Sequence, residues 1–236
     1  MKIIIKDNKE EIAELVSKRI IDKINSKKGH AVLGLATGST PIPTYQKLIH
    51  AYHRGEVSFK YVTTFNLDEY LDNGYELLSY RATMNRDLFN QVDIEKKCTN
   101  FPSVNNMFQY DEMIAKAGGI DIQLLGIGRD GHIGFNEPGT LFTSTTHVSE
   151  LDEMTRKDNS RFFPNLDEVP TRSITMGLRT IFMAKEIILI ATGTNKAEII
   201  RDLVKNKPSV DLPASILKNH PDTTIYLDKD AASLLE

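Results

Sequence analysis

The sequence predicts an α/β fold in which an open, mostly parallel sheet carries helices on both faces. Short runs of β-branched and other apolar residues alternate along the chain with segments of helical periodicity. These runs are continuously apolar, which is typical of strands buried on both faces of a parallel sheet. No internal repeat, low-complexity tract or flexible linker divides the 236 residues. We therefore expect residues 1–236 to form a single domain.

Strands are predicted at residues 3–5, 31–35, 61–65, 120–125, 186–191 and 224–227. After the first strand, Ile12, Val16 and Ile20 recur at helical spacing, and Asn8 with Glu11 is typical of a capping box before that helix. Further helices are predicted at residues 44–54, 109–117 and 195–204. Parallel sheets bind ligands beyond the carboxyl ends of their strands, so the loops that follow the strands are candidate sites.

Composition excludes several classes of protein. The 29 basic and 32 acidic residues nearly cancel, and no basic block indicates a nucleic-acid partner. Cys98 is the single cysteine, which rules out an internal disulfide and indicates a reducing, cytoplasmic setting. The N-terminal MKIIIKDNKEE has too short an apolar run for a signal peptide or a membrane span. We expect a soluble cytoplasmic protein that binds neither nucleic acid nor membrane.

The most informative segment is LGIGRDGHIGFNEP at residues 125–138, directly after a predicted strand. It places Asp130, His132 and Glu137 within eight positions among four glycines. Histidine titrates near neutral pH, and a neighbouring carboxylate sets its tautomer and raises its pKa. The pattern indicates a proton-transfer site. An ordinary surface turn, in which Asp130 bonds its own backbone, is the alternative.

The same segment also matches the G-x-G-x-x-G pattern through Gly126, Gly128 and Gly131. A dinucleotide site requires a helix to begin immediately after this pattern, with its N–H groups facing the pyrophosphate. Pro138 follows too soon for a long helix, and Asp130 would present a negative charge to the phosphates. We therefore expect no NAD site and no redox cofactor.

Two further loops at strand ends are suited to a phosphate ester. The first is ATGSTP at residues 36–41, where Gly38, Ser39 and Thr40 precede a predicted helix. A plain helix cap by Ser or Thr is the alternative, and no lysine follows as a Walker A loop would require. The second loop is TGTNKA at residues 192–197, where Lys196 can pair with a phosphate or remain a surface lysine.

A general base and a lid are also predicted. Asp68 and Glu69 follow the strand at residues 61–65, although adjacent acidic residues in loops are usually solvated. The polar stretch at about residues 143–172 is long for a simple connection and is interpreted as a lid. Arg161 within it can reach a substrate phosphate with two N–H groups. His50 and His53 lie three apart without a third ligand, so no metal site is expected.

Six motifs, in this order, resemble those of the glucosamine-6-phosphate deaminases: LATGSTP, TFNLDEY, LGIGRDGHIGFNEPG, DNSRFF, TGTNKA and VDLPASIL. The resemblance runs from about residue 31 to about residue 227. The 6-phosphogluconolactonases share the Gly-Asp-Gly-His element but lack the FNEP continuation. The resemblance implies a modified Rossmann-like fold and the conversion of glucosamine 6-phosphate and water to fructose 6-phosphate and ammonia.

The resemblance also implies a role for each matching residue. Asp68 would move the proton between C2 and C1 of the sugar. His132 would open the pyranose ring, with Asp130 and Glu137 orienting and polarising it. The residues that would hold the phosphate are Gly38, Ser39, Thr40, Arg161 and Lys196. The family requires no redox cofactor and no catalytic metal.

Two segments depart from the pattern of the relatives. Ser144, Thr145 and Thr146 stand where many have Ser-Arg-Thr, and residues 71–84 read LDNGYELLSYRATM in place of a sequence with Gly-Leu and His-Pro. Neither departure touches the proton-transfer residues, and both concern regulation and the approach to the site. Galactosamine 6-phosphate as substrate, a lactonase and a non-catalytic sugar-phosphate sensor remain alternatives. A homo-oligomer also remains open.

Overall fold

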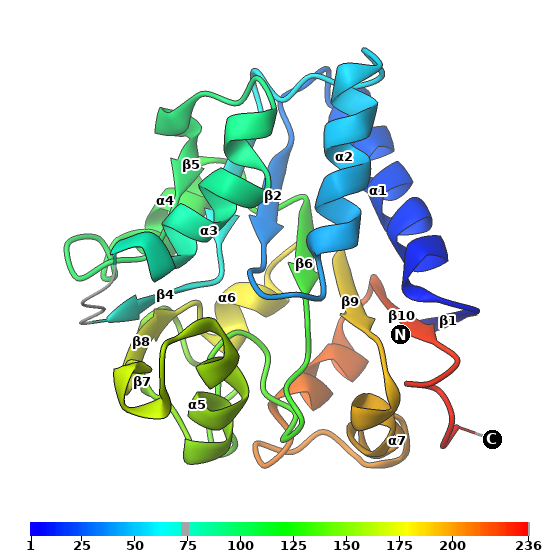
Figure 1. Ribbon diagram of the computed structural model, residues 1–236, viewed down its shortest axis with the longest axis vertical. Coiled ribbons are helices and arrows are strands. Elements are labelled where there is room, and N and C mark those ends of the chain that lie inside the picture. Colours follow the sequence, from blue (N-terminus) through cyan, green and yellow to red (C-terminus); the bar gives the residue numbers. More distant parts are fainter. Residues whose placement is uncertain (72–75, 236) are drawn as a thin grey trace.

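The computed structural model describes residues 1–71 and 76–235. Its central sheet comprises β1 (Lys2–Lys6), β2 (Val32–Leu35), β3 (Thr63–Asn66), β5 (Thr99–Asn100), β6 (Ile122–Leu125), β9 (Ile187–Ala191) and β10 (Thr223–Asp228). These seven strands are arranged in the order β1-β10-β9-β6-β2-β3-β5, and every neighbouring pair is parallel (Figure 1). The predicted parallel α/β fold is confirmed.

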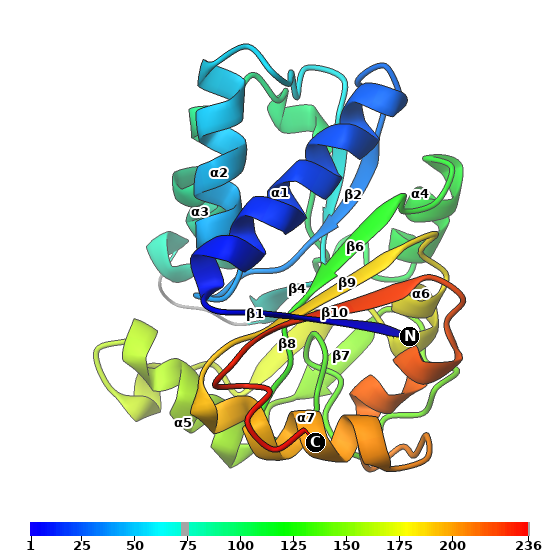
Figure 2. The same ribbon diagram turned by 90° about the vertical axis from the view of Figure 1, so that its right-hand side faces the viewer.

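Helices cover both faces of this sheet (Figure 2). One face is covered by α1 (Lys9–Ser26), α2 (Ile42–His53) and α3 (Tyr80–Asp87), and the other by α4 (Tyr110–Lys116), α6 (Leu178–Phe182) and α7 (Ala197–Lys205). Within β9, Ile188 and Ile190 pack on the first layer, whereas Ile187 and Leu189 pack on the second. Every residue of the central strands β2, β6 and β9 is therefore buried, which explains their continuous apolar runs.

Short 3-10 turns connect these elements: η1 (Glu76–Leu78), η2 (Phe89–Gln91), η3 (Lys96–Cys98), η4 (Ser160–Phe162), η5 (Leu166–Glu168), η6 (Thr194–Lys196) and η7 (Pro213–Asn219). Among the helices that the structure describes, none combines the length and the apolar character that a membrane span needs.

The start of α1 follows the predicted capping pattern in part. Asn8 Oδ1 accepts a hydrogen bond from the Glu11 N–H at 3.0 Å, as an N-cap residue does. The reciprocal contact differs, because the Glu11 carboxylate accepts from the Asn8 side-chain amide at 3.4 Å. Ile12, Val16 and Ile20 are buried on the sheet side, as their spacing predicts.

A second, smaller sheet was not predicted. It is antiparallel and contains β4 (Asp68–Leu71), β8 (Arg172–Thr175) and β7 (His147–Glu150), in that order. The stretch at residues 143–172 therefore carries β7 and the helix α5 (Glu153–Asn159), and is not a plain connection. The sequence does not predict these strands because they are short and largely polar.

A small apolar cluster holds this region together. Tyr70, Phe135, Leu151, Phe163 and Val169 form a buried group apart from the two main cores. Phe163 is buried, whereas the adjacent Phe162 is 43% exposed. Only the second phenylalanine of the pair therefore anchors the segment at residues 143–172 to the protein.

Replacement of Gly177, which lies between β8 and α6, is expected to destabilise the fold. A Cβ atom there would lie 2.2 Å from the carbonyl oxygen of Ser144. Backbone cannot yield as a flexible side chain does, so Gly177→Ala should lower the free energy of unfolding by about 1–3 kcal/mol in urea denaturation. Gly126→Ala is the control, because a Cβ there has no neighbour within 4 Å. Equal stability of the two variants would contradict the packing at Gly177.

Candidate active site

The loops beyond several parallel strands converge on one cavity of about 160 Å³. In Figure 1 the arrowheads of β2, β6 and β9 point toward the region beside α5. Seven of the predicted site residues line the cavity: Gly38, Ser39, Thr40, Asp68, His132, Arg161 and Lys196. The other two, Asp130 and Glu137, contact His132. The structure therefore brings together all the residues that the sequence singled out.

Glycine at position 128 allows the loop after β6 to fold closely around His132. A Cβ atom at Gly128 would lie 2.3 Å from His132 Nδ1 and 2.6 Å from Asp130 Oδ1. No helix begins between residues 126 and 146, a stretch that the structure describes completely. Gly128 thus serves side-chain packing within the loop, and the helix that a dinucleotide site requires does not follow this pattern.

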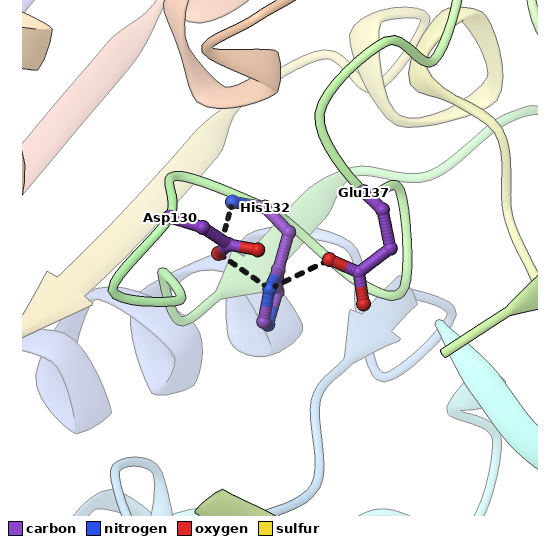
Figure 3. A group of neighbouring side chains, drawn as sticks. All are labelled: Asp130, His132 and Glu137. Carbon is purple, nitrogen blue, oxygen red and sulfur yellow. Dashed lines mark hydrogen bonds and ion pairs between the residues drawn. The ribbon is translucent and has the colours of Figure 1, made fainter. Parts of the chain in front are cut away.

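His132 is held between two carboxylates (Figure 3). Its Nδ1 atom lies 2.7 Å from Asp130 Oδ1 and 3.5 Å from Glu137 Oε2. Burial disfavours the charged ring, but the hydrogen bonds and charges of Asp130 and Glu137 outweigh it and raise the pKa of His132 to about 9. The imidazolium is therefore the favoured form at neutral pH, and Nε2 remains for a ligand in the cavity.

Asp130 shows the opposite shift. Burial by itself would raise the pKa of its carboxyl group. The hydrogen bond and charge of His132 prevail, so the pKa of Asp130 lies well below its ordinary value. Asp130 is consequently ionised throughout the neutral range and stabilises the imidazolium.

The same three side chains have a spacing that could also hold a metal ion. The ligand atoms of Asp130, His132 and Glu137 all lie within 4.8 Å of one another. Oxygen and imidazole donors of this kind suit a divalent cation. A proton shared between His132 Nδ1 and the two carboxylates supplies the positive charge that stabilises these carboxylates, as a metal ion would. The predicted absence of a metal is therefore a question for experiment.

Asp68 is buried at the start of β4, with only 6% of its surface exposed. Burial, followed by the charge of Glu69, raises the pKa of Asp68 to about 8, and His132 opposes this shift. A Cβ atom at Gly134 would lie 3.7 Å from Asp68 Oδ2, so the backbone of the Gly134 loop passes close to the carboxylate. A carboxyl group with this pKa can take up and return a proton near neutral pH.

Glu69, the other member of the acidic pair, has a structural role. Its carboxylate accepts hydrogen bonds from the backbone N–H groups of Tyr70 at 2.9 Å, Tyr80 at 2.8 Å and Arg81 at 2.9 Å. Two of these donors belong to the first turn of α3, where N–H groups lack partners within the helix. Of the pair, only Asp68 lines the cavity.

The loop before α2 has the features of an anion site. Pro41 is the N-cap of α2 and no side chain caps the helix, so the simple capping role considered for Ser39 or Thr40 is wrong. Pro41 and Pro43 have no N–H group, so the Ile42 and Thr44 N–H groups are the donors that this helix start can offer an anion. Gly38 adopts a φ of +88°, which favours glycine in this turn.

Two cationic side chains face this loop across the cavity. Arg161 Nη2 lies 3.5 Å from Ser39 Oγ. Lys196 Nζ donates a hydrogen bond to the carbonyl oxygen of Ile127 at 2.7 Å, and burial lowers the pKa of this lysine. An anionic ligand bound between Arg161 and Lys196 would neutralise their positive charges.

Several residues of the cavity were not predicted from the sequence. Three come from α5 (Thr155, Asp158 and Asn159), and Thr155 Oγ1 lies 3.5 Å from His132 Nδ1. Asp158 and Asn159 begin the DNSRFF motif, although the sequence singled out only Arg161 within it, and Thr155 has no local signal because it is an ordinary polar residue on a short helix. Their role follows only from the packing of α5 against the loop after β6.

The two segments that depart from the relatives' pattern lie in different places: the described part of the first borders the cavity, and the second packs against α6. Residues 72–75 lie outside the described part of the chain. Beyond them, Ser79 accepts a hydrogen bond from the Ala82 N–H at 3.1 Å as the N-cap of α3, and Tyr80 lines the cavity. Ser144 Oγ accepts from the Leu178 N–H at 2.9 Å, which joins the second segment to α6.

Comparison with known proteins identifies the family. The family model described as glucosamine-6-phosphate isomerases/6-phosphogluconolactonase matches residues 7–226. The chain belongs to this family. A protein of Mycoplasma mycoides subsp. mycoides named glucosamine-6-phosphate deaminase is 49% identical, with 100% of this chain and 98% of that protein covered. A protein of the same name from Bacillus pumilus is 48% identical, with 99% and 100% covered.

Two solved structures are also similar to this chain. That of a monomeric glucosamine-6-phosphate deaminase has a TM-score of 0.96 and 43% identity, and covers 99% of this chain and 100% of that one. A 6-phosphogluconolactonase from Trypanosoma brucei has a TM-score of 0.76 at 20% identity, with 100% of this chain and 98% of that one covered. The second similarity shows a shared fold only.

Removing one carboxylate should lower the pKa of His132. In Asp130→Asn the imidazolium loses its nearest negative charge while burial remains, so the ring should release its proton at lower pH than in the wild type. We expect a downward shift of at least one pH unit in an NMR titration of the ring nitrogens, about tenfold in proton affinity. The other histidine signals provide the internal control. An unchanged titration would contradict the electrostatic role of Asp130.

Proposed function

We propose that this family member acts as a glucosamine-6-phosphate deaminase. The reaction is the conversion of glucosamine 6-phosphate and water to fructose 6-phosphate and ammonia, a step of amino sugar catabolism that starts from N-acetylglucosamine. The observation that carries the proposal is the pairing of a buried base, Asp68, with a cationic acid, His132, in one cavity. Relatives with this name are 45–49% identical over nearly the whole chain.

Binding and ring opening come first. The sugar phosphate would bind with its phosphate at the loop before α2, between Arg161 and Lys196. His132 would then donate the proton on Nε2 to the ring oxygen, which breaks the bond between C1 and that oxygen. Asp130 and Glu137 stabilise the charge on the ring through Nδ1. The C1 hydroxyl group releases its proton to water as its oxygen becomes the carbonyl oxygen, and the product of this step is the open-chain aldehyde.

Asp68 would then carry out the aldose–ketose shift. Its carboxylate takes the proton from C2 while the C1 carbonyl oxygen takes up a proton from water, which gives an enolamine, and Asp68 then returns its proton to C1. The resulting ketimine has a C=N bond at C2, and water adds there to release ammonia and leave the ketone of fructose 6-phosphate. Binding of the remote phosphate supplies free energy that orients C1 and C2 over the base.

The segment at residues 143–172 is proposed to act as a lid. It contributes Thr155 and Arg161 to the cavity, pairs with β8 through β7, and packs through Phe163 into the small apolar cluster. Closure would exclude water during proton transfer, and opening would admit the water that the imine requires. The lone Cys98 supports a cytoplasmic location.

Three rival functions make different predictions. Galactosamine 6-phosphate differs only in its configuration at C4 and would use the same chemistry. A lactonase would hydrolyse 6-phosphogluconolactone, but the lactonases of known structure are far less similar to this chain. A sugar-phosphate sensor would not need a carboxyl group with a pKa of about 8 beside a cationic histidine.

Purified protein should release ammonia and fructose 6-phosphate in equal amounts from glucosamine 6-phosphate. The assay is run with EDTA and without added cofactor, because a shared proton makes a metal unnecessary at His132. Asp68→Asn should lower kcat at least about 100-fold and leave substrate binding nearly unchanged. Asp22→Asn, an exposed aspartate on α1, is the matched control.

The outcomes of this assay separate the rivals. Faster turnover of galactosamine 6-phosphate than of glucosamine 6-phosphate in a parallel assay would make galactosamine 6-phosphate the assigned substrate. Binding without turnover of either sugar would favour the sensor. Near wild-type kcat in Asp68→Asn would refute the assigned base.

The pH dependence of kcat/KM should be bell-shaped. Asp68 must be ionised to act as a base, so kcat/KM should rise as pH increases toward the pKa of about 8. His132 must be protonated to act as an acid, so kcat/KM should fall above about pH 9. In Glu137→Gln the alkaline limb should move to lower pH, because the imidazolium loses a negative neighbour. A profile with no alkaline limb would refute the acid role of His132.

A further inference from the structure

An ion pair that the proposed mechanism does not use joins α5 to the loop after β6. Arg129 Nε donates to Asp158 Oδ2 at 2.9 Å, and Arg129 Nη2 contacts Oδ1 of the same carboxylate. The pair is therefore bidentate, the geometry in which arginine holds a carboxylate most firmly. The side chains are 43% and 39% exposed, so the pair lies at the rim of the molecule and not in its core.

Only one member of this ion pair lines the cavity. Asp158 lines it, together with the proposed phosphate ligands Arg161 and Lys196. Arg129 is not among the lining residues and approaches Asp158 from outside. A carboxylate in a site for a dianionic phosphate repels the ligand and attracts the cations that the ligand needs.

The charges of Asp158 and Arg129 both influence the pKa of Lys196. Burial lowers the pKa of Lys196, the charge of Asp158 opposes that shift, and the charge of Arg129 adds to it. Asp158 and Lys196 thus line one cavity, and their opposite charges attract each other across it. In the structure Lys196 instead donates to the carbonyl oxygen of Ile127.

We propose that Arg129 is a positioning residue that keeps the Asp158 carboxylate away from the phosphate-binding cations. The proposal rests on the proposed function only in taking Arg161 and Lys196 as ligands of a phosphate. Arg129 neutralises Asp158 from outside the cavity, so that an incoming phosphate meets two cations that are free to bind it. Without Arg129, the carboxylate competes with the phosphate for Lys196 and Arg161.

Asp158 itself has a reason to be at this position. Thr155 lies three residues earlier on α5, and residues at this spacing share one face of a helix. Thr155 Oγ1 lies 3.5 Å from His132 Nδ1, while Asp158 binds Arg129 in the same loop. The pair therefore also holds α5 against the loop that carries His132. Asp158 contributes this contact, and Arg129 removes its electrostatic cost to phosphate binding.

The test is a double-mutant cycle with inorganic phosphate as the probe. Binding is measured by isothermal titration calorimetry for wild type, Arg129→Ala, Asp158→Asn and the double variant, so no turnover is required. Arg129→Ala should weaken phosphate binding about tenfold, a moderate loss because the rim is partly solvated. Asp158→Asn in the Arg129→Ala background should restore most of this affinity. The tenfold loss should shrink at high salt.

A merely structural ion pair gives a different pattern. If the pair only fastened α5, the two single variants and the double variant would all weaken phosphate binding equally. That result would overturn the proposal, as would unchanged binding in Arg129→Ala or no phosphate binding by the wild type. Arg54→Ala is the matched control, because Arg54 makes a bidentate pair with Glu56 at 2.6 and 2.9 Å away from the cavity.

Three further experiments complete the design. Thermal unfolding verifies that each variant folds, and Arg129→Gln repeats the test with a side chain of similar length. With glucosamine 6-phosphate, Arg129→Ala should raise KM far more than it lowers kcat. If the wild type binds phosphate but releases no ammonia, the proposed function fails while the phosphate cycle still decides the role of Arg129.

Discussion

Parallel pairing of β2 with β3 and β6 is the constraint on which the site depends. Because the strands run in one direction, the loops that follow them leave the sheet at the same edge. In the central pair, Gly34 on β2 leaves room for the buried side chain of Gln123 on β6, whose Oε1 would lie 2.0 Å from a Cβ at that position. The phosphate loop, the base and the histidine loop thus meet although they lie far apart in the sequence.

Burial acts on the ionisable groups of this edge in opposite ways. For Asp68, burial is the largest influence and outweighs the opposing charge of His132, so its pKa rises to about 8. His132 has two carboxylates at its Nδ1 atom, so its pKa rises to about 9 despite burial. One desolvated cavity therefore contains both a base and an acid that function near neutral pH.

The apolar strands were predictable because burial on both faces leaves a continuous pattern in the sequence. The strands β4, β7 and β8 left no such pattern, since they are short, partly polar and stabilised by cross-chain contacts. Tyr70 and Phe163 pack together there although 93 positions, from 70 to 163, separate them. The sequence consequently predicts a lid at residues 143–172 but predicts neither the strand β7 nor the helix α5 within it.

The sequence by itself determined the strand and helix periodicity, the residues of the proton-transfer loop and the candidate phosphate ligands, because these are local patterns of residue type. Only the tertiary structure decided which acid of the pair Asp68 and Glu69 faces the cavity. It also decided that α5 places Thr155 and Asp158 beside the histidine loop. The physical reason is that burial and the distance between charges depend on contacts between segments that no local pattern records.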